Sequence, residues 1–174
     1  MMQLGFNFSA TYCNGWPKLR FLIDNDIYHD FEFAGDSAFV ELPVDLIDGE
    51  HKLDIEFYGK TYNNTVVEND VIKQDQLATL NSIHIDKIQV PDFVKYQGIY
   101  NVNDSSIPSA LTWGQNGVWS LTFNWPIINW VLSYKLNSFY SDDQWSTAVY
   151  HPKKIKLLID NLTELENTLA NVAL

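Results

Sequence analysis

The chain has 174 residues, 46% of them hydrophobic and 19% charged, which is typical of one folded domain and excludes a disordered segment. Its 11 basic and 22 acidic residues give a formal net charge of -11, which disfavours nucleic acid and anionic membranes as partners because both repel an acidic surface. The single cysteine excludes an intrachain disulfide, and neither a secretory leader nor a membrane span is visible, so we expect synthesis in a reducing cytoplasm.

The first two thirds of the chain have side chains that alternate between apolar and polar at every second position. This period of two is typical of strands with one buried and one wet face, and turn residues such as Asn14-Gly15 and Asp48-Gly49 separate the runs. The runs cover residues 4–12, 19–23, 27–33, 39–44 and 53–57. Short antiparallel strands at this spacing predict a mainly β fold, an antiparallel β-sandwich or jelly roll.

Farther along the chain, strand patterns alternate with polar stretches. Residues 59–77 and 101–110 are polar and poorly periodic, so we expect loops there, of a kind often linked to function. A strand resumes near Leu80, and another follows the turn signal Asn116-Gly117.

The last part of the chain changes its period. After Pro152, which suits a first helical turn, apolar residues recur at steps of three and four, the pattern of an amphipathic α-helix. We predict a sandwich domain over residues 1–135, then a loop and a C-terminal helix over 136–174 that packs on the sandwich or on a neighbouring subunit. The candidate interface residues on this helix are Ile155, Leu158, Leu162, Leu165 and Leu169.

The familiar catalytic signatures are missing from the sequence. The four histidines are scattered, no serine lies in a GxSxG elbow, and no glycine-rich phosphate loop occurs. Carboxylates are plentiful but cluster in turns, where they are usually solvated. We therefore expect no catalytic residue and a chain that is not an enzyme. The alternative is a glycan-cleaving enzyme that uses two loop carboxylates.

Two turns place carboxylates one residue apart, Asp24 with Asp26 and Glu68 with Asp70. Such hard oxygen ligands suit calcium, although neither turn has the full spacing of a helix-loop-helix calcium site. Ordinary turn chemistry explains the same residues, because Asp side chains bond their own backbone there. We predict that the protein needs no cofactor, with calcium at these four residues as the alternative.

Aromatic and amide side chains near turns form a candidate ligand site. Exposed aromatic rings stack on sugars, and side-chain amides bond hydroxyl groups. The other reading is that the tryptophans plug the ends of the sandwich, since most Trp area is buried. The candidate ligand-binding residues are Trp16, Tyr62, Asn63, Asn64, Trp113 and Asn116.

The middle of the chain carries a more specific pattern of short runs. They are Asp48 to Thr61, Thr65 to Val67, Lys73 to Leu77, Ile83 to Ile88, Gly98 to Tyr100 and Trp113 to Trp119, with Phe123, Trp125-Pro126 and Trp130 after them. Over residues 48–132 this pattern resembles small virion proteins of tailed bacteriophages, especially marine T4-like myoviruses, whose sandwich is similar to carbohydrate-binding modules. The resemblance implies a particle with many copies and assembly contacts, and it implies no particular functional residue.

Together, the residues and the resemblance predict a non-catalytic structural or accessory protein of a bacteriophage particle, at the tail, baseplate, fibre or head surface. Located in the virion, it would act by protein–protein contacts with other virion proteins in a multi-copy assembly. The loops 59–77 and 101–116 and the terminal helix are the expected contacts. The alternative is a carbohydrate-binding module, calcium-assisted in one version, that recognises a host-surface glycan. Neither nucleic acid nor a membrane is an expected partner.

Overall fold

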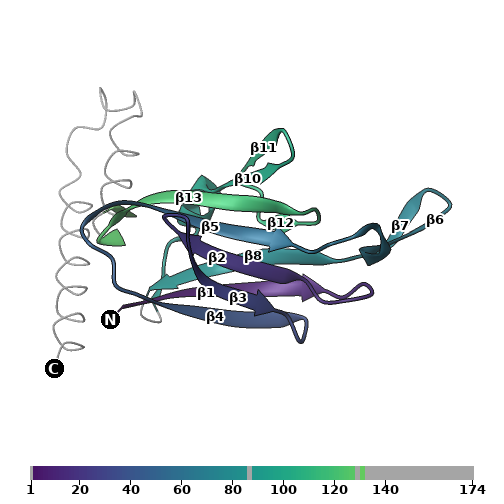
Figure 1. The fold of residues 1–174 in the computed structure, drawn as a ribbon, viewed down its shortest axis with the longest axis horizontal. Helices are drawn as coiled ribbons and strands as arrows, with labels where there is room; N and C mark the ends of the chain where they lie inside the picture. Colours follow the sequence, from purple (N-terminus) through teal and green to yellow (C-terminus); the bar gives the residue numbers. More distant parts are fainter. Residues whose placement is uncertain (1, 86–87, 128–129, 132–174) are drawn as a thin grey trace, which may run out of the picture. The chain divides into compact units, whose positions relative to one another are not determined.

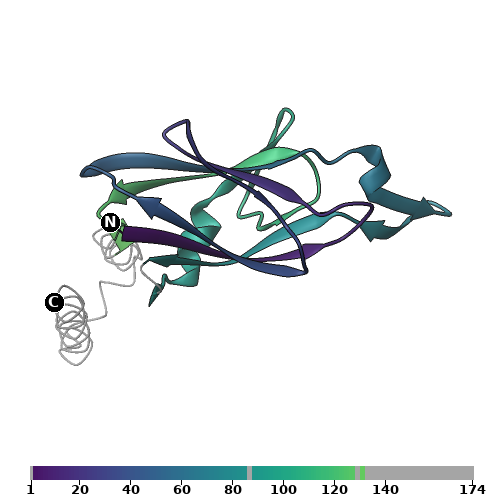
Figure 2. The same ribbon diagram turned by 60° about the horizontal axis from the view of Figure 1, so that its bottom comes forward.

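The computed structural model describes residues 2–85, 88–127 and 130–131. They belong to the first of two units, residues 1–131, and the second unit covers residues 132–174. The predicted C-terminal helix and its candidate interface residues therefore lie outside the described residues. Within the first unit, two antiparallel sheets pack face to face (Figures 1 and 2).

One sheet has the strand order β12-β8-β1-β4, and β9 pairs with β8. Its strands are β1 (Met2–Thr11), β4 (Ser37–Val44), β8 (Leu77–Ile85), β9 (Ile88–Gln89) and β12 (Thr112–Trp113). The strand β1 lies in the middle and pairs antiparallel with both β4 and β8. Its alternating pattern puts Leu4, Phe6 and Phe8 on the buried face, as the period of two predicts.

The second sheet has the strand order β11-β10-β13-β5-β2-β3. Its strands are β2 (Lys18–Ile23), β3 (Asp26–Glu32), β5 (Gly49–Tyr58), β10 (Ile99–Val102), β11 (Ser105–Pro108) and β13 (Gly117–Trp125). The long central strands β5 and β13 pair along nine positions, from Gly117 opposite Phe57 to Trp125 opposite Gly49. Strand β13 ends before a cis peptide bond between Trp125 and Pro126.

The core between the sheets is aromatic. Phe6 of one sheet and Phe21 of the other have ring centroids 5.4 Å apart, and both side chains are fully buried. Burial of one such ring contributes about 1.5–3 kcal/mol. The prediction of a mainly β, antiparallel sandwich is confirmed, because the alternation places one face of β1, β4, β5, β8 and β13 in this shared core. The edge strand β3 is the exception, since it is exposed or half-exposed along its whole length.

Two of the expected loops contain regular structure instead. Within 59–77 the chain forms the 3₁₀ turn η1 (Tyr62–Asn64) and a hairpin of β6 (Thr65–Glu68) and β7 (Val71–Asp75), which projects beyond the sheets at one end (Figure 1). Within 101–110, β10 and β11 form a second hairpin. Strands β7 and β11 are exposed or half-exposed along their whole length, so no buried face imposes a period of two on them.

A second 3₁₀ segment, η2 (Asp92–Gln97), lies between β9 and β10. Among the described residues, no helix has both the length and the apolar character needed to cross a membrane.

Candidate functional site

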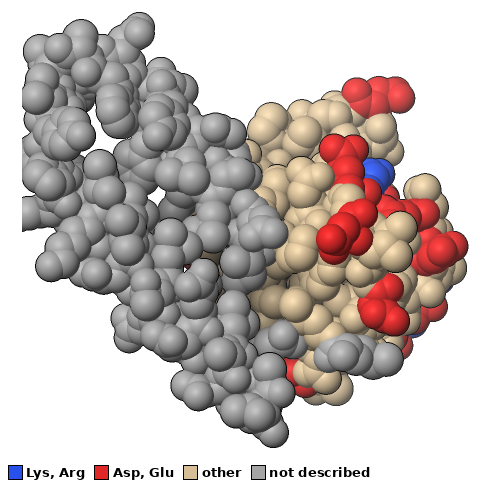
Figure 3. Space-filling model, turned by 90° about the vertical axis from the view of Figure 1, so that its left-hand side faces the viewer, with Lys and Arg blue, Asp and Glu red and all other residues tan. Residues whose placement is uncertain are grey.

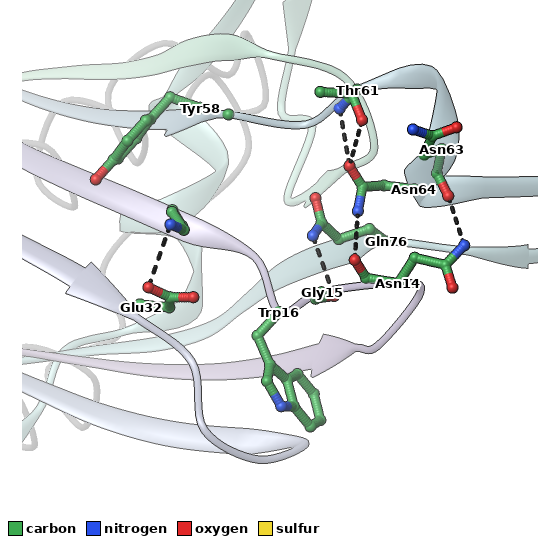
Figure 4. Close-up of a pocket in the computed structure, with 11 residues that line it drawn as sticks. Asn14, Gly15, Trp16, Glu32, Tyr58, Thr61, Asn63, Asn64 and Gln76 are labelled. Carbon is green, nitrogen blue, oxygen red and sulfur yellow. Dashed lines mark hydrogen bonds and ion pairs between the residues drawn. The ribbon is translucent and has the colours of Figure 1, made fainter.

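A polar pocket of about 340 Å³ lies at the end of the sandwich from which the β6–β7 hairpin projects (Figure 4). Four separate segments of the chain line it: the β1–β2 connection with the first residue of β2, the last residue of β3, the end of β5 with η1, and the residue between β7 and β8. The lining residues are Asn14, Gly15, Trp16, Lys18, Glu32, Tyr58, Gly59, Thr61, Asn63, Asn64 and Gln76.

Strand register brings the charged and aromatic part of the pocket together. Lys18 lies opposite Glu32 on one neighbouring strand and opposite Tyr58 on the other. The Lys18 ammonium is 3.3 Å from a Glu32 carboxylate oxygen, and both side chains are largely exposed. Arg20 stacks over the Tyr58 ring at 4.9 Å from its centroid, which holds this ring in place beside the pocket.

The turn between β1 and β2 supplies the opposite wall. Asn14 adopts a left-handed conformation with φ of 52°, and Gly15 has φ of 146°, a value that favours glycine. This turn directs Trp16 to the pocket rim, where its ring contacts Tyr12 edge to face at 5.2 Å between centroids. Trp16 is half-buried, so part of its ring remains available to a ligand.

Asn64 is the structural centre of the pocket. Its amide nitrogen donates to the carbonyl oxygens of Cys13 at 2.9 Å and Asn14 at 3.2 Å. Its amide oxygen accepts from the backbone N–H and the hydroxyl of Thr61, at 2.9 and 3.0 Å. These four bonds use the full capacity of one amide. Asn64 therefore joins the η1 turn to the β1–β2 turn, and it has no group left for a ligand.

The side-chain amides of Asn14 and Gln76 also bond to this wall of the pocket, and each keeps a side-chain oxygen free of bonds to the described residues. Asn14 donates through its side chain to the Asn63 carbonyl at 2.7 Å, and Gln76 donates to the Gly15 carbonyl at 3.1 Å. Gln76 is only 4% exposed. Within the described part of the chain, no hydrogen bond is made by the side-chain oxygen of either Asn14 or Gln76. Two acceptors, one of them on a nearly buried side chain, are therefore left for donors from a ligand.

A buried lysine anchors the base of the hairpin behind the pocket. The Lys60 side chain is 8% exposed, and its ammonium pairs with Asp75 and donates to the carbonyls of Gln76 at 3.0 Å and Gly114 at 2.6 Å. Asn116 accepts from the Lys60 backbone N–H at 2.9 Å and donates to its carbonyl at 2.8 Å. Sequence reasoning missed Lys60, because nothing in the local pattern distinguishes it from a solvated lysine.

The structure separates the predicted ligand-binding residues. Trp16, Asn63 and Asn64 line the pocket. Tyr62 is 87% exposed but is not part of the lining, and Asn116 holds the Lys60 backbone. Trp113 is fully buried, so the prediction that it contacts a ligand is wrong. The reason is its pairing opposite Ala78 in the sheet, which turns the ring into the core against Tyr100 at 5.6 Å between centroids.

Sequence reasoning also missed Gln76, Lys18, Glu32 and Tyr58. Each is an ordinary strand-end or connection residue in the sequence, and only strand register makes them neighbours. The one available signal was the fold itself, since loops at one end of a sandwich gather whatever strand ends lie there.

The four candidate calcium ligands lie in two tight hairpin turns. Asp24 has φ of 53° and Asp70 has φ of 61°, each beside an asparagine with positive φ, as type I′ turns require. One turn joins β2 to β3 beside the start of β5, whereas the other joins β6 to β7 beyond the end of β5. Among the described residues, no group of three or more His, Cys, Asp or Glu side chains is placed to hold a metal ion.

No family model matches this sequence, and no curated protein matches it either. Among solved structures, vCBM60 in complex with galactobiose is 9% identical, with a TM-score of 0.48 over 68% of this chain and 96% of that chain. The selenomethionine form of vCBM60, from work on two families of calcium-dependent carbohydrate binding modules, is 9% identical, with a TM-score of 0.45 over 70% of this chain and 90% of that chain.

Proposed function

We propose that this protein is a non-catalytic carbohydrate-binding module and that the pocket between Trp16, Tyr58 and Gln76 is its sugar site. The observation that carries the proposal is the combination of side-chain amides, an ion pair and two aromatic side chains around one open cavity. Ligand sites commonly combine a concave surface with a few converging polar groups.

The chemistry of the free groups suits a polyhydroxylated ring. A sugar hydroxyl both donates and accepts, so it can donate to the free Gln76 or Asn14 oxygen while it accepts from the exposed Asn63 amide. The apolar C–H face of a sugar packs on the exposed part of the Trp16 or Tyr58 ring. Because the Asn64 bonds hold the wall in one arrangement without a ligand, little ordering is needed when a ligand binds.

The pocket is poorly suited to glycoside hydrolysis. That reaction commonly uses two carboxyl groups that flank the scissile bond. Among the described residues that line the pocket, Glu32 is the only carboxylate, and it is paired with Lys18. Binding without turnover is therefore the function that the lining favours.

A glycan array followed by calorimetric titration of the full chain tests the proposal. We expect at least one neutral glycan to bind, and we expect Trp16→Ala to lower its affinity about tenfold, as loss of one aromatic anchor does. Tyr28→Ala is the matched control, because Tyr28 is a half-exposed aromatic on β3 outside the pocket lining. Absence of any glycan ligand, or an equal loss in the control, would contradict the proposal.

The same titration with a chelator addresses calcium. The pocket groups are amides, aromatic rings and one ion pair, so we expect affinity to be unchanged in EDTA. Loss of binding in EDTA would support the calcium-assisted version instead, with the metal held by residues other than the pocket lining.

Protein contact within a virion is a second candidate function, and the β6–β7 hairpin favours it. Val67, Val71 and Ile72 are each more than half exposed on this projecting ribbon. A lone two-stranded hairpin is only marginally stable in water, so a partner over its apolar residues would stabilise it. Purification of phage particles with this chain attached, and its loss after Val67→Ser with Ile72→Ser, would support this role. Location in the virion stays a prediction.

A further inference from the structure

His51 lies at the end of the sandwich opposite the pocket, at the start of β5. Its side chain lies on the same core-facing side of β5 as Leu53 and Ile55, and it is 7% exposed. Its ring lies 6.0 Å from that of Phe123 on the neighbouring strand β13. An ionisable ring thus occupies a core position where an apolar side chain would be expected.

Both ring nitrogens of His51 face hydrogen-bond acceptors. Nδ1 lies 2.6 Å from a carboxylate oxygen of Asp24, and Nε2 lies 2.8 Å from the backbone carbonyl oxygen of Ile47. Neither a carboxylate nor a carbonyl donates a hydrogen bond, so both nitrogens must carry a proton. In this ring orientation the geometry therefore requires the imidazolium form.

The imidazolium connects three parts of the chain. Asp24 belongs to the β2–β3 turn and also accepts from the backbone N–H of Lys52 at 2.8 Å. Ile47 belongs to the connection that leads from β4 of one sheet to β5 of the other. This connection is also anchored by the buried Val44 before it and by Leu46, which is half-buried against the core, while Asp45, Ile47 and Asp48 are exposed.

We propose that His51 and Asp24 form a pH-sensitive latch that holds the 45–48 connection closed while His51 is protonated. This inference is independent of the sugar site. When His51 loses its proton, Nδ1 keeps the remaining one because the Asp24 carboxylate needs a donor. The unprotonated Nε2 then faces the Ile47 carbonyl with a lone pair, the hydrogen bond is lost, and the connection opens.

The charges around this end support protonation of His51. Acidic side chains predominate over basic ones on the described surface seen from this side (Figure 3). The segments packed around His51 carry ionisable side chains at Asp24 and Asp26, at Asp45 and Asp48, and at Glu50 and Lys52. The Lys52 ammonium is directed to Asp54, 2.9 Å away, and β13 offers only the uncharged Thr122, Phe123 and Asn124.

The pKa values shift in the directions that a latch needs. The Asp24 hydrogen bond, then the Ile47 carbonyl, raise the pKa of His51 above its ordinary value of 6.5. The His51 hydrogen bond, then the Lys52 N–H, lower the pKa of Asp24 below 3.8. At a pH between the two shifted pKa values, Asp24 and His51 are both charged and the latch is closed. The latch opens as the pH rises through the pKa of His51.

Ring-nitrogen NMR of the full chain, together with hydrogen exchange, tests the latch. We expect His51 to titrate with a midpoint above 6.5, and we expect exchange in residues 45–51, corrected for intrinsic rates, to increase through the same midpoint. Each pH unit above the midpoint lowers the protonated fraction about tenfold. The turn at residues 69–70, in the other hairpin, is the internal reference and should show no such change.

Two variants test whether the protonation of His51 controls the 45–48 connection or whether His51 contributes only packing. Asp24→Asn removes the carboxylate but keeps the side-chain size, so it should lower the His51 midpoint and shift the exchange transition to lower pH by the same amount. His51→Phe should keep the ring packing and remove the transition. A His51 midpoint at or below 6.5, or exchange in 45–51 that does not follow that midpoint, would overturn the proposal.

Discussion

The two ends of the sandwich are held together by different chemistry. At the pocket end, neutral amides bond to backbone groups beside the Lys60–Asp75 ion pair, and Asn64 alone joins two turns with four hydrogen bonds. At the opposite end, the charged pair of His51 and Asp24 joins the β2–β3 turn to the 45–48 connection. The pocket wall should therefore keep its shape over a wide pH range, whereas the opposite end should respond to protons.

This difference suits a binding site at the amide end. Amides do not titrate, so a wall made of them offers a ligand the same donors and acceptors at every physiological pH. The charge of histidine changes in the range where cells and their surroundings differ. The comparison thus predicts that variants at the two ends differ in pH dependence as well as in size of effect.

The largest effect is expected for Lys60→Met at the base of the β6–β7 hairpin, behind the pocket. Removal of the buried ammonium leaves Asp75 and two carbonyl oxygens without their partner, which should lower the free energy of unfolding by about 3 kcal/mol. Urea unfolding followed by tryptophan fluorescence measures this. Lys73→Met is the matched control, since Lys73 is exposed on β7 and should have little effect. Equal effects of both variants would show that Lys60 is no anchor.

Next in size is Asn64→Ala. The loss of four hydrogen bonds from a side chain that is 8% exposed should cost about 2 kcal/mol of unfolding free energy. The loss should be the same at pH 5.5 and pH 8, because no titrating group takes part. Sugar affinity should fall as well, since the Asn14 turn is then free to move. A loss that varies with pH would contradict the distinction between the two ends.

A smaller effect, with a distinct pH profile, is expected for His51→Phe. The raised pKa of His51 means that its contribution is complete below pH 6.5 and is lost as the pH rises through the shifted value. The lowered pKa of Asp24 means that the pair also weakens as the pH falls below 3.8 and through its shifted value. At pH 6 the variant should be less stable by about 1 kcal/mol.

The difference between wild type and His51→Phe should shrink as the pH rises above the His51 midpoint. Denaturant unfolding at a series of pH values measures it, with His29→Phe as the control because His29 is exposed on β3. A constant difference at all pH values would mean that the ring acts by packing alone.

The smallest effect is expected for Tyr62→Ser. Tyr62 is 87% exposed and does not line the pocket, so stability should change by less than about 0.5 kcal/mol and sugar affinity should stay the same. Calorimetric titration beside Trp16→Ala measures this. An affinity loss as large as that of Trp16→Ala would extend the ligand site beyond the pocket and would restore the role that the sequence predicted for Tyr62.

The strands were predictable where one face is buried. Runs such as 4–12 and 53–57 alternate because every second side chain enters the core, and they correspond to β1 and β5. The β6–β7 hairpin was not predictable in this way, since every residue of β6 and β7 is exposed or half-exposed. Trp113 was misread for a related reason, because the turn residues beside it indicated exposure while its strand pairing places it in the core.

The sequence by itself determined the fold class, because alternation of apolar and polar side chains is a local property that the chain carries with it. It also marked the turns, where asparagine, aspartate and glycine adopt positive φ. Only the tertiary structure decided which strand ends meet at the pocket and which acceptors surround His51. Those neighbours are up to 62 positions apart, from Asn14 to Gln76, and strand register rather than local pattern brings them together.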